Sequence, residues 1–240
     1  MRCPNTGPTP LTRRPRSRTA AALLFAVHAA FLLAFPAAVA AANDGGALRD
    51  YMEARGVFWS QLYDGGGETL YCGMTFTRGR GARKLNIEHV FPMSWVTRAL
   101  KCGRRNECRK RSARFNRIEA DLHNLYPARA DINQERSSMA FGIVRGEKRR
   151  YGQCDFEVNR RKRRAEPRPA ARGKIARAMF YMADRYRLTI FPRQRRLLRQ
   201  WNRAHPPGAD EKRRNDVIQR LQGRRNPYID NPSLADAANR

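Results

Sequence analysis

The sequence is short of acidic residues. It has 21 Asp and Glu against 49 Lys and Arg, so its formal net charge at pH 7 is +28 over 240 residues. A protein this basic usually meets phosphate groups, on a nucleic acid or on an anionic surface. Because 41% of the residues are hydrophobic and 9% are aromatic, the chain can bury a core, and wholesale disorder is excluded. The length favours one domain, or at most two.

Cysteine is scarce, and its spacing does not fit the common zinc sites. No C-x-x-C pair occurs, and five residues separate Cys102 from Cys108. Cys3 lies in the N-terminal segment described next, so the rest of the chain has an even four cysteines, which allow three pairings. We predict two disulfides, with Cys102–Cys108 closing a short loop and Cys72–Cys154 linking distant segments.

The N-terminal 40 residues contain five arginines and no acidic residue. An apolar run follows the arginines at 20–35, and Ala38-Val39-Ala40 has the small-x-small pattern of a cleavage site. The run is shorter than the roughly 20 residues of a membrane-spanning helix, which argues against an anchor. We therefore predict a cleaved secretory signal peptide at 1–40 and a single domain at 41–240. The protein is expected to be exported, either periplasmic or secreted, with no stable membrane association after cleavage.

Hydrophobic periodicity predicts an α+β protein without internal repeats. The pattern indicates a basic loop at 101–117, because eight of these residues are Lys or Arg. Strands are predicted at 70–77 and 85–90. Helices are predicted at 47–62, 128–139, 172–186, from Pro192 onward, and at about 209–222.

The first candidate for chemistry is the Glu88-His89 pair at the end of the second predicted strand. Adjacent strand residues face opposite sides, but Pro92 indicates that the strand ends here, so both side chains could enter one cleft. A carboxylate that holds a cation and a histidine that takes a proton from water suffice to hydrolyse a phosphodiester. The alternative is a surface acid beside a half-buried histidine, and the dipeptide alone favours it.

The second candidate is the segment 121–127, followed by Asn133 and Arg136. Asp121 and His123 are predicted to share one strand face, where the carboxylate could orient the imidazole. The amide oxygen of Asn133 is an acceptable ligand for an ion of the magnesium type. The alternatives are a structural Asp-His pair and an asparagine that caps a helix.

Further short motifs follow in order along the chain. They are Tyr151-Gly152-Gln153-Cys154, Ala165-Glu166-Pro167, Arg172-Gly173-Lys174-Ile175-Ala176-Arg177, Phe180-Tyr181-Met182, Trp201-Asn202 and Asn226-Pro227-Tyr228. The same order includes the earlier segments Ile87-Glu88-His89-Val90 and Asp121-Leu122-His123-Asn124-Leu125, and Asn133. In this set of motifs the sequence resembles the bacterial endonuclease I family of secreted and periplasmic non-specific nucleases. A lone Glu-His pair is weak evidence, whereas this ordered set spans nearly all of 41–240.

The resemblance implies an α+β fold in which helices surround a small sheet that carries a ββα-metal (His-Me finger) motif, stabilised by disulfides. It implies that His89 is the general base and that Glu88 and Asn133 hold one Mg²⁺, which Mn²⁺ or Ca²⁺ can replace. Arg104 matches the arginine that steadies the cleaved phosphate, with Arg105 as the alternative. The products would carry 5′-phosphate and 3′-hydroxyl ends.

The expected partners are double- and single-stranded DNA, and RNA, bound without sequence preference by a monomer. Arg105, Arg109, Lys110 and Arg136 are candidate nucleic-acid contacts, because clusters of cations suit phosphate tracking. A rival hypothesis is an exported cationic scaffold that binds nucleic acid without catalysis. A second rival is an enzyme that acts on another anionic substrate, such as a phosphatase.

Overall fold

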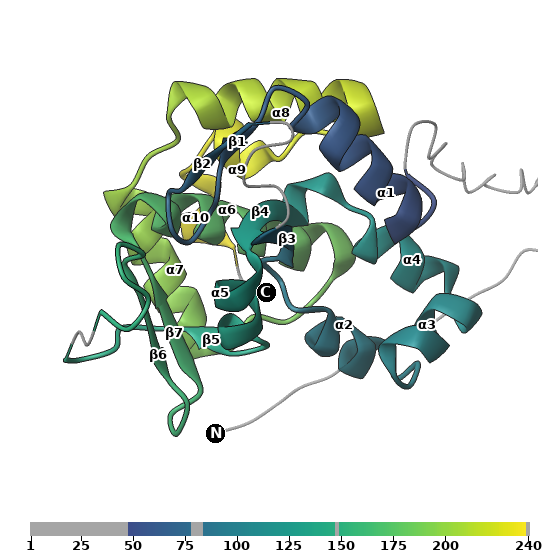
Figure 1. The fold of residues 1–240 in the computed structure, drawn as a ribbon. Helices are drawn as coiled ribbons and strands as arrows, with labels where there is room; N and C mark the ends of the chain where they lie inside the picture. Colours follow the sequence, from purple (N-terminus) through teal and green to yellow (C-terminus); the bar gives the residue numbers. More distant parts are fainter. Residues whose placement is uncertain (1–47, 78–83, 147–148, 239–240) are drawn as a thin grey trace, which may run out of the picture. The chain divides into compact units, whose positions relative to one another are not determined.

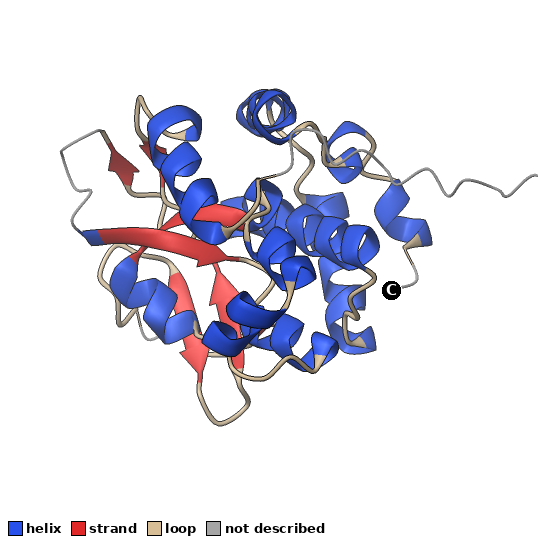
Figure 2. Cartoon of the chain, turned by 90° about the vertical axis from the view of Figure 1, so that its right-hand side faces the viewer, coloured by secondary structure: helices blue, strands red, loops and turns tan. Residues whose placement is uncertain are grey.

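A computed structural model of the chain describes residues 48–77, 84–146 and 149–238. The predicted signal peptide lies outside the described residues. Within them, no helix is long and apolar enough to span a bilayer. The helices, which are blue in Figure 2, are α1 (Tyr51–Val57), η1 (Phe58–Leu62), α2 (Met93–Leu100), α3 (Arg105–Arg111), α4 (Ala113–Glu119), η3 (Leu122–Asn124), α5 (Ala130–Arg136), α6 (Pro169–Tyr186), α7 (Pro192–Ala204), α8 (Ala209–Gln222), α9 (Pro227–Asp230) and α10 (Leu234–Ala237).

The strands of this α+β fold form small sheets (Figure 1). One sheet pairs β1 (Gly67–Glu68) with β2 (Thr75–Phe76), and a three-stranded sheet has the order β5 (Ala140–Phe141), β7 (Arg164–Pro167), β6 (Phe156–Asn159). Between them in sequence, β3 (Leu85–His89) pairs antiparallel with β4 (Leu125–Arg129). Helix α5 follows β4 directly and packs on both strands. This strand–strand–helix unit carries the candidate residues Glu88, His89 and Asn133.

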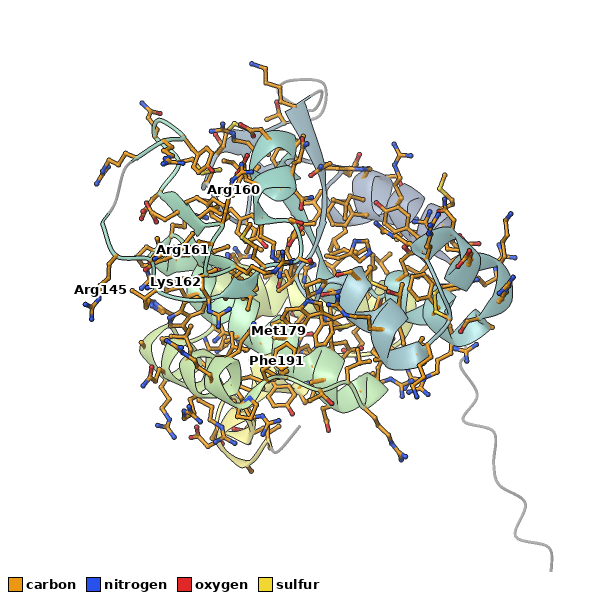
Figure 3. All side chains as sticks on the ribbon, turned by 90° about the horizontal axis from the view of Figure 1, so that it is seen from below. Arg145, Arg160, Arg161, Lys162, Met179 and Phe191 are labelled. Carbon is orange, nitrogen blue, oxygen red and sulfur yellow. A yellow bond between two sulfur atoms is a disulfide. The ribbon has the colours of Figure 1, made fainter. Side chains whose placement is uncertain are left out.

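Helix α6 forms much of the core, as its sequence pattern predicts. Ile175, Met179 and Met182 recur at helical spacing and are fully buried, and Met179 lies at the centre of the view in Figure 3. Helix α7 packs along α6. The helices predicted at the C-terminal end are confirmed, and the apolar residue that α8 buries is Ile218.

The predicted basic loop at 101–117 is wrong, because most of it is helical in α3 and α4. The Ser112 side chain accepts a hydrogen bond from the Phe115 backbone N–H and thereby caps the start of α4. Cys108, Phe115 and Ile118 are buried on the inner faces of the two helices, while most of the cations remain outside. An amphipathic helix needs only a few apolar residues on its inner face, so a segment with many cations can still form one.

Two expectations about strands are also corrected. The strand predicted at 70–77 is reduced to β2, since residues 70–72 form a turn that places Leu70 and Tyr71 in the core. Asp121 and His123 do not share a strand face. Asp121 caps the short helix η3 by accepting the His123 backbone N–H at 2.9 Å, and its carboxylate also accepts hydrogen bonds from the hydroxyls of Tyr181 and Tyr186. The sequence reading missed the sheet of β5, β6 and β7.

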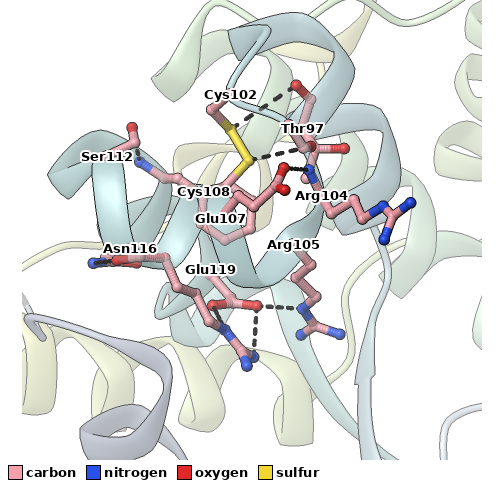
Figure 4. The surroundings of a disulfide bond; sticks show 12 residues. Thr97, Cys102, Arg104, Arg105, Glu107, Cys108, Ser112, Asn116 and Glu119 are labelled. Carbon is pink, nitrogen blue, oxygen red and sulfur yellow. Dashed lines mark hydrogen bonds and ion pairs between the residues drawn. A yellow bond between two sulfur atoms is a disulfide. The ribbon is translucent and has the colours of Figure 1, made fainter.

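Both predicted disulfides are confirmed. Cys72–Cys154 joins residues 82 positions apart and ties the N-terminal part of the domain to the segment before β6. Cys102–Cys108 joins residues six positions apart and links the end of α2 to α3 (Figure 4). The first bridge closes a long loop, so it restricts the unfolded chain more strongly than the second.

His123 is buried in a neutral form behind the candidate site. Its Nε2 lies 3.1 Å from the carbonyl oxygen of Arg224, and its ring packs edge-on against Tyr181. Burial lowers the pKa of His123 to about 4; the neighbouring Asp121 opposes this shift, and Arg214 adds to it. Protonation of this imidazole must therefore destabilise the folded state.

We expect the stability of the fold to fall between pH 7.5 and pH 5, in part because of His123. The pKa of an unfolded histidine is about 6.5, so in this range the unfolded chain binds more protons than the folded one, and stability rises with pH. A folded pKa of about 4 makes the contribution of His123 about 2 kcal/mol over this interval. Urea unfolding at both pH values should show that His123→Phe, which keeps a ring, loses less stability than the parent. An equal loss in both proteins would contradict the assignment.

Candidate active site

Glu88 lies on β3 with its carboxylate buried at 3% exposure. Its Oε1 accepts a hydrogen bond from the Tyr71 hydroxyl at 2.5 Å and pairs with Arg136 Nη1 at 2.9 Å. Burial raises the pKa of Glu88, whereas Arg136 and Tyr71 act in the opposite direction. Both of these side-chain contacts use Oε1, so Oε2 has no side-chain partner among the described residues and is the oxygen that can bind an ion.

His89 lies on the other face of β3 from Glu88, so the two side chains flank the end of the strand from opposite sides. The strand stays regular through the pair His89↔Leu125, and neighbouring residues of a regular strand point to opposite faces. The imidazole Nε2 lies 3.0 Å from the carbonyl oxygen of Glu119, and the ring centroid is 5.2 Å from that of Tyr51. Since a carbonyl only accepts, Nε2 carries the proton and Nδ1 keeps its lone pair.

The electrostatic surroundings keep His89 neutral. Burial, followed by the charge of Arg105, lowers its pKa to about 4. A second cation, Arg109, acts in the same direction, while the Glu119 carbonyl and carboxylate oppose it. At neutral pH the ring is therefore ready to accept a proton at Nδ1.

A buried ion cluster built on Glu119 lies beside His89. Its carboxylate accepts from Arg105 Nε at 2.5 Å and from Arg109 Nε at 2.7 Å. Both guanidinium groups also lie over the ring of Tyr51, at 5.6 and 5.4 Å from its centroid. The side chains of Arg105 and Arg109 are 44% and 37% exposed, so each keeps part of its guanidinium toward solvent. The cluster thus holds two cations next to the histidine.

Arg104 is placed differently from Arg105. Its backbone N–H donates to Glu107 Oε2 at 2.7 Å at the start of α3, and its side chain is exposed. Figure 4 shows its guanidinium pointing away from Glu119, whereas Arg105 points toward that carboxylate. The structure therefore brings Arg105, and not Arg104, into the surroundings of His89. Lys110 is exposed on α3.

Asn133 lies on α5 against the Glu88 face of β3. Its Nδ2 donates to Asn86 Oδ1 at 2.7 Å and lies 3.3 Å from the Ile87 carbonyl oxygen. Asn86 and Glu88 are two residues apart and share one strand face, so Asn133 and Glu88 lie on the same side of β3. The amide is held through its nitrogen, which leaves Oδ1 as the oxygen that can act as a ligand.

These donors fit a magnesium ion. One carboxylate and one amide oxygen are hard ligands, and Mg²⁺ is commonly held by few protein oxygens while it keeps several waters. Within the residues that the structure describes, no group of three or more His, Cys, Asp or Glu side chains is arranged to hold a metal. The donor set therefore suits a partly hydrated ion rather than a closed structural site.

Arg136 is buried, which corrects the expectation that it contacts nucleic acid. It is 1% exposed, and its guanidinium donates to the carbonyl oxygens of His89 at 3.1 Å and Val90 at 2.6 Å besides pairing with Glu88. The same group lies 4.6 Å above the Phe141 ring centroid. Arg136 thus fixes the end of β3 and the orientation of the Glu88 carboxylate.

A comparison with known protein families gives a match over most of the chain. The model of the Endonuclease I family matches residues 42–233. This chain belongs to that family. The match includes the β3–β4–α5 unit and both disulfides, so it covers every candidate residue described above.

Individual relatives in the Endonuclease I group carry names of secreted nucleases. The chain is 38% identical over 153 residues to the "Periplasmic deoxyribonuclease" of Aeromonas hydrophila, covering 62% of this chain and 64% of the relative. It is 38% identical to an "Extracellular deoxyribonuclease" of the same species, covering 62% and 66%. It is 31% identical to the "Extracellular ribonuclease" of Bacillus amyloliquefaciens, covering 48% and 45%. The matches to the two deoxyribonucleases thus span just under two thirds of each relative's length.

Three residues around the site in this family member escaped sequence reasoning. Glu119 orders the two arginines beside His89, Tyr51 packs on the imidazole, and Tyr71 holds Glu88. One feature of the sequence could have marked Glu119 as a candidate: it ends a strongly basic segment in which acidic residues are scarce. The two tyrosines approach the site only through the tertiary fold, and the sequence has no local pattern that marks them.

Proposed function

We propose that this chain is an exported, metal-dependent endonuclease that hydrolyses phosphodiester bonds of DNA and RNA without sequence preference. The observation that carries the proposal is the His89 imidazole, held at Nε2 by a backbone carbonyl and neutral at physiological pH, next to a carboxylate that is a suitable ion ligand. The names of the relatives support the same activity and an exported location.

His89 would act as the general base through Nδ1. The hydrogen bond from Nε2 to the Glu119 carbonyl fixes the tautomer and the plane of the ring, and it can strengthen when the ring becomes positively charged. The low pKa of the imidazole ensures that it is unprotonated before the reaction begins. Nδ1 would take a proton from the attacking water while the water oxygen bonds to phosphorus and the P–O3′ bond breaks. The leaving O3′ would take up a proton from solvent, so the products would have 5′-phosphate and 3′-hydroxyl ends.

Glu88 Oε2 and Asn133 Oδ1 would hold one Mg²⁺. When bound, such an ion supplies positive charge that stabilises the pentacovalent phosphate and the leaving oxygen. Arg136 and Tyr71 hold the Glu88 carboxylate in place from behind. Among the described strands, β3 pairs with β4 alone, so its other edge is not covered by a strand. A phosphate bound along that edge could be reached by Glu88 from one face of β3 and by His89 from the other.

Arg105 is the better candidate to steady the phosphate than Arg104. Its Nε is held by Glu119, and its side chain is still 44% exposed, so the terminal nitrogens can donate to phosphate oxygens. Arg109 is held by Glu119 through both Nε and Nη2, which leaves its Nη1 as a further donor. The exposed Arg104 and Lys110 would contribute to binding along the backbone.

The decisive experiment is relaxation of supercoiled plasmid by the purified protein. We expect nicking with Mg²⁺, none with EDTA, and recovery when excess Mg²⁺ is restored, because the ion supplies charge that the protein residues do not replace. Tight DNA binding with no cleavage under Mg²⁺, Mn²⁺ or Ca²⁺ would contradict the proposal and favour the scaffold hypothesis. A small phosphate monoester serves as the control substrate, and its hydrolysis without plasmid nicking would favour the phosphatase hypothesis.

A further inference from the structure

A wide groove lies between the three-stranded sheet and α7. Its volume is about 1290 Å³, above the roughly 300–1,000 Å³ of pockets that take small molecules. Its walls come from α2, from β5 and the residues after it, from the β6–β7 turn and from α7. A groove of this size fits a segment of a polymer better than a single small ligand.

Among the described residues, the groove is lined by several cations and by no carboxylate. Arg145, Lys162 and Arg164 line the sheet side, and Arg193 and Arg196 line the α7 side. Figure 3 shows Arg145 and Lys162 near each other at the edge of the molecule. Such a lining attracts a polyanion from both walls.

The cations of the groove have no carboxylate partners among the described residues. Elsewhere the fold pairs many of its arginines, for example Arg160 with Glu135 and Arg225 with Asp230. An unpaired cluster of like charges is unfavourable in the free protein, and a bound chain of phosphates would relieve the repulsion.

Apolar surface gathers in the same groove. Phe191 is 57% exposed, and its ring packs edge-on against Trp95 at 5.4 Å. Ile143 is 56% exposed and lines the groove as well. Phe191 therefore presents an exposed ring, held on one side by Trp95, in a groove that cations line. Aromatic rings in basic grooves are the usual platforms on which unpaired bases stack.

Gln194 is a buried amide in the wall of the groove. It is 4% exposed, and neither its Nε2 nor its Oε1 has a hydrogen-bond partner among the described residues. A buried amide without partners is unfavourable, so such groups normally bind a ligand or water. A small shift of this side chain toward the groove would bring one donor and one acceptor to a bound strand.

We propose that this groove binds an unpaired stretch of a nucleic-acid strand, with its phosphates on the cations and a base stacked on Phe191. Bases within a duplex are already stacked and paired, so they cannot use the ring of Phe191 or the amide of Gln194. The proposal deepens the nuclease function proposed above and rests on it. It adds that substrates with a single-stranded segment are held more firmly than fully paired ones.

The groove adjoins the candidate active site. Phe141 lines the groove, and the guanidinium of Arg136 lies 4.6 Å above its ring. The same guanidinium pairs with Glu88 at 2.9 Å. A strand in the groove therefore lies behind the carboxylate of Glu88, separated from it by the buried side chains of Arg136 and Phe141.

The test is binding of fluorescent oligonucleotides in EDTA, which prevents cleavage, measured by anisotropy against a 12-nucleotide oligothymidine and a 12-base-pair duplex. We expect Phe191→Ala to weaken oligothymidine binding about tenfold and duplex binding less than twofold, because a lost base stack affects only the unpaired strand. In R193A/R196A, the slope of log affinity against log salt for oligothymidine should become shallower by about 1.4, from two lost phosphate contacts.

Arg213→Ala with Arg220→Ala is the matched control, because both are exposed arginines of α8 outside the groove. This double variant should leave the preference for the single strand unchanged. Oligothymidine affinities within twofold of the parent for Phe191→Ala would overturn the proposal, as would equal losses for the oligonucleotide and the duplex. Cleavage of plasmid with Mg²⁺ is measured separately, so failure of the groove proposal and failure of the nuclease proposal give different results.

Discussion

Replacing His89 with alanine is expected to lower the rate of plasmid cleavage about 10²- to 10⁴-fold, the usual contribution of a positioned general base. The imidazole is buried and neutral, and its Nε2 is already engaged by the Glu119 carbonyl. The variant leaves Glu88 and Asn133 in place, so binding of Mg²⁺ and of DNA should persist. Cleavage is measured under single-turnover conditions with saturating Mg²⁺, so that the chemical step is observed.

His205→Ala serves as the control for this experiment. His205 follows α7 and contacts none of the candidate residues through its ring in the described structure, so its loss should change the rate less than twofold. DNA affinity in EDTA shows whether His89→Ala still binds its substrate. A rate within tenfold of the parent, with DNA affinity unchanged, would show that His89 is not the base.

Removal of the Cys72–Cys154 disulfide is expected to reduce the free energy of unfolding by about 4.5 kcal/mol, from the loop entropy of an 82-residue separation. Folded domains commonly have only about 5–15 kcal/mol in total, so this loss approaches the whole stability of the protein. The measurement is urea unfolding of C72A/C154A against the parent under oxidising conditions.

The second disulfide provides the matched comparison. Cys102–Cys108 closes a loop of only six residues, so C102A/C108A should lose about 2 kcal/mol. Equal losses in the two double variants would contradict the dependence on loop length. If the prediction holds, the reduced protein is poorly folded, so the proposed nuclease would become active only in an oxidising compartment and would spare the nucleic acid of the producing cell.

The arrangement around His89 shows how a very basic protein can keep a reactive histidine neutral. Glu119 neutralises part of the charge of Arg105 and Arg109, yet both remain close enough to disfavour a second positive charge on the ring. Partial exposure of the two guanidinium groups leaves them free to meet a phosphate. One buried carboxylate thus serves to position two cations and, through its backbone, the imidazole.

Local features of the fold could be predicted because they depend on neighbouring residues. Ile175, Met179 and Met182 recur at helical spacing, and that periodicity survives in α6. Strand β3 follows from its alternation and from Pro92 beyond its end. The prediction of a loop at 101–117 was wrong because it rested on the number of cations within the segment. Burial of Phe115 and Ile118 depends instead on residues from distant parts of the chain that pack against them.

By itself, the sequence determined the family, the helices α6 to α8, the pairing of four cysteines and the residues that are candidates for catalysis. Only the tertiary structure decided that Arg136 is buried beneath Glu88, and that Arg105 rather than Arg104 lies near His89. It also decided that cations from α7 and from the sheet face one groove. Composition and periodicity act along the chain, but the surroundings of a charged group depend on which distant segments pack against it.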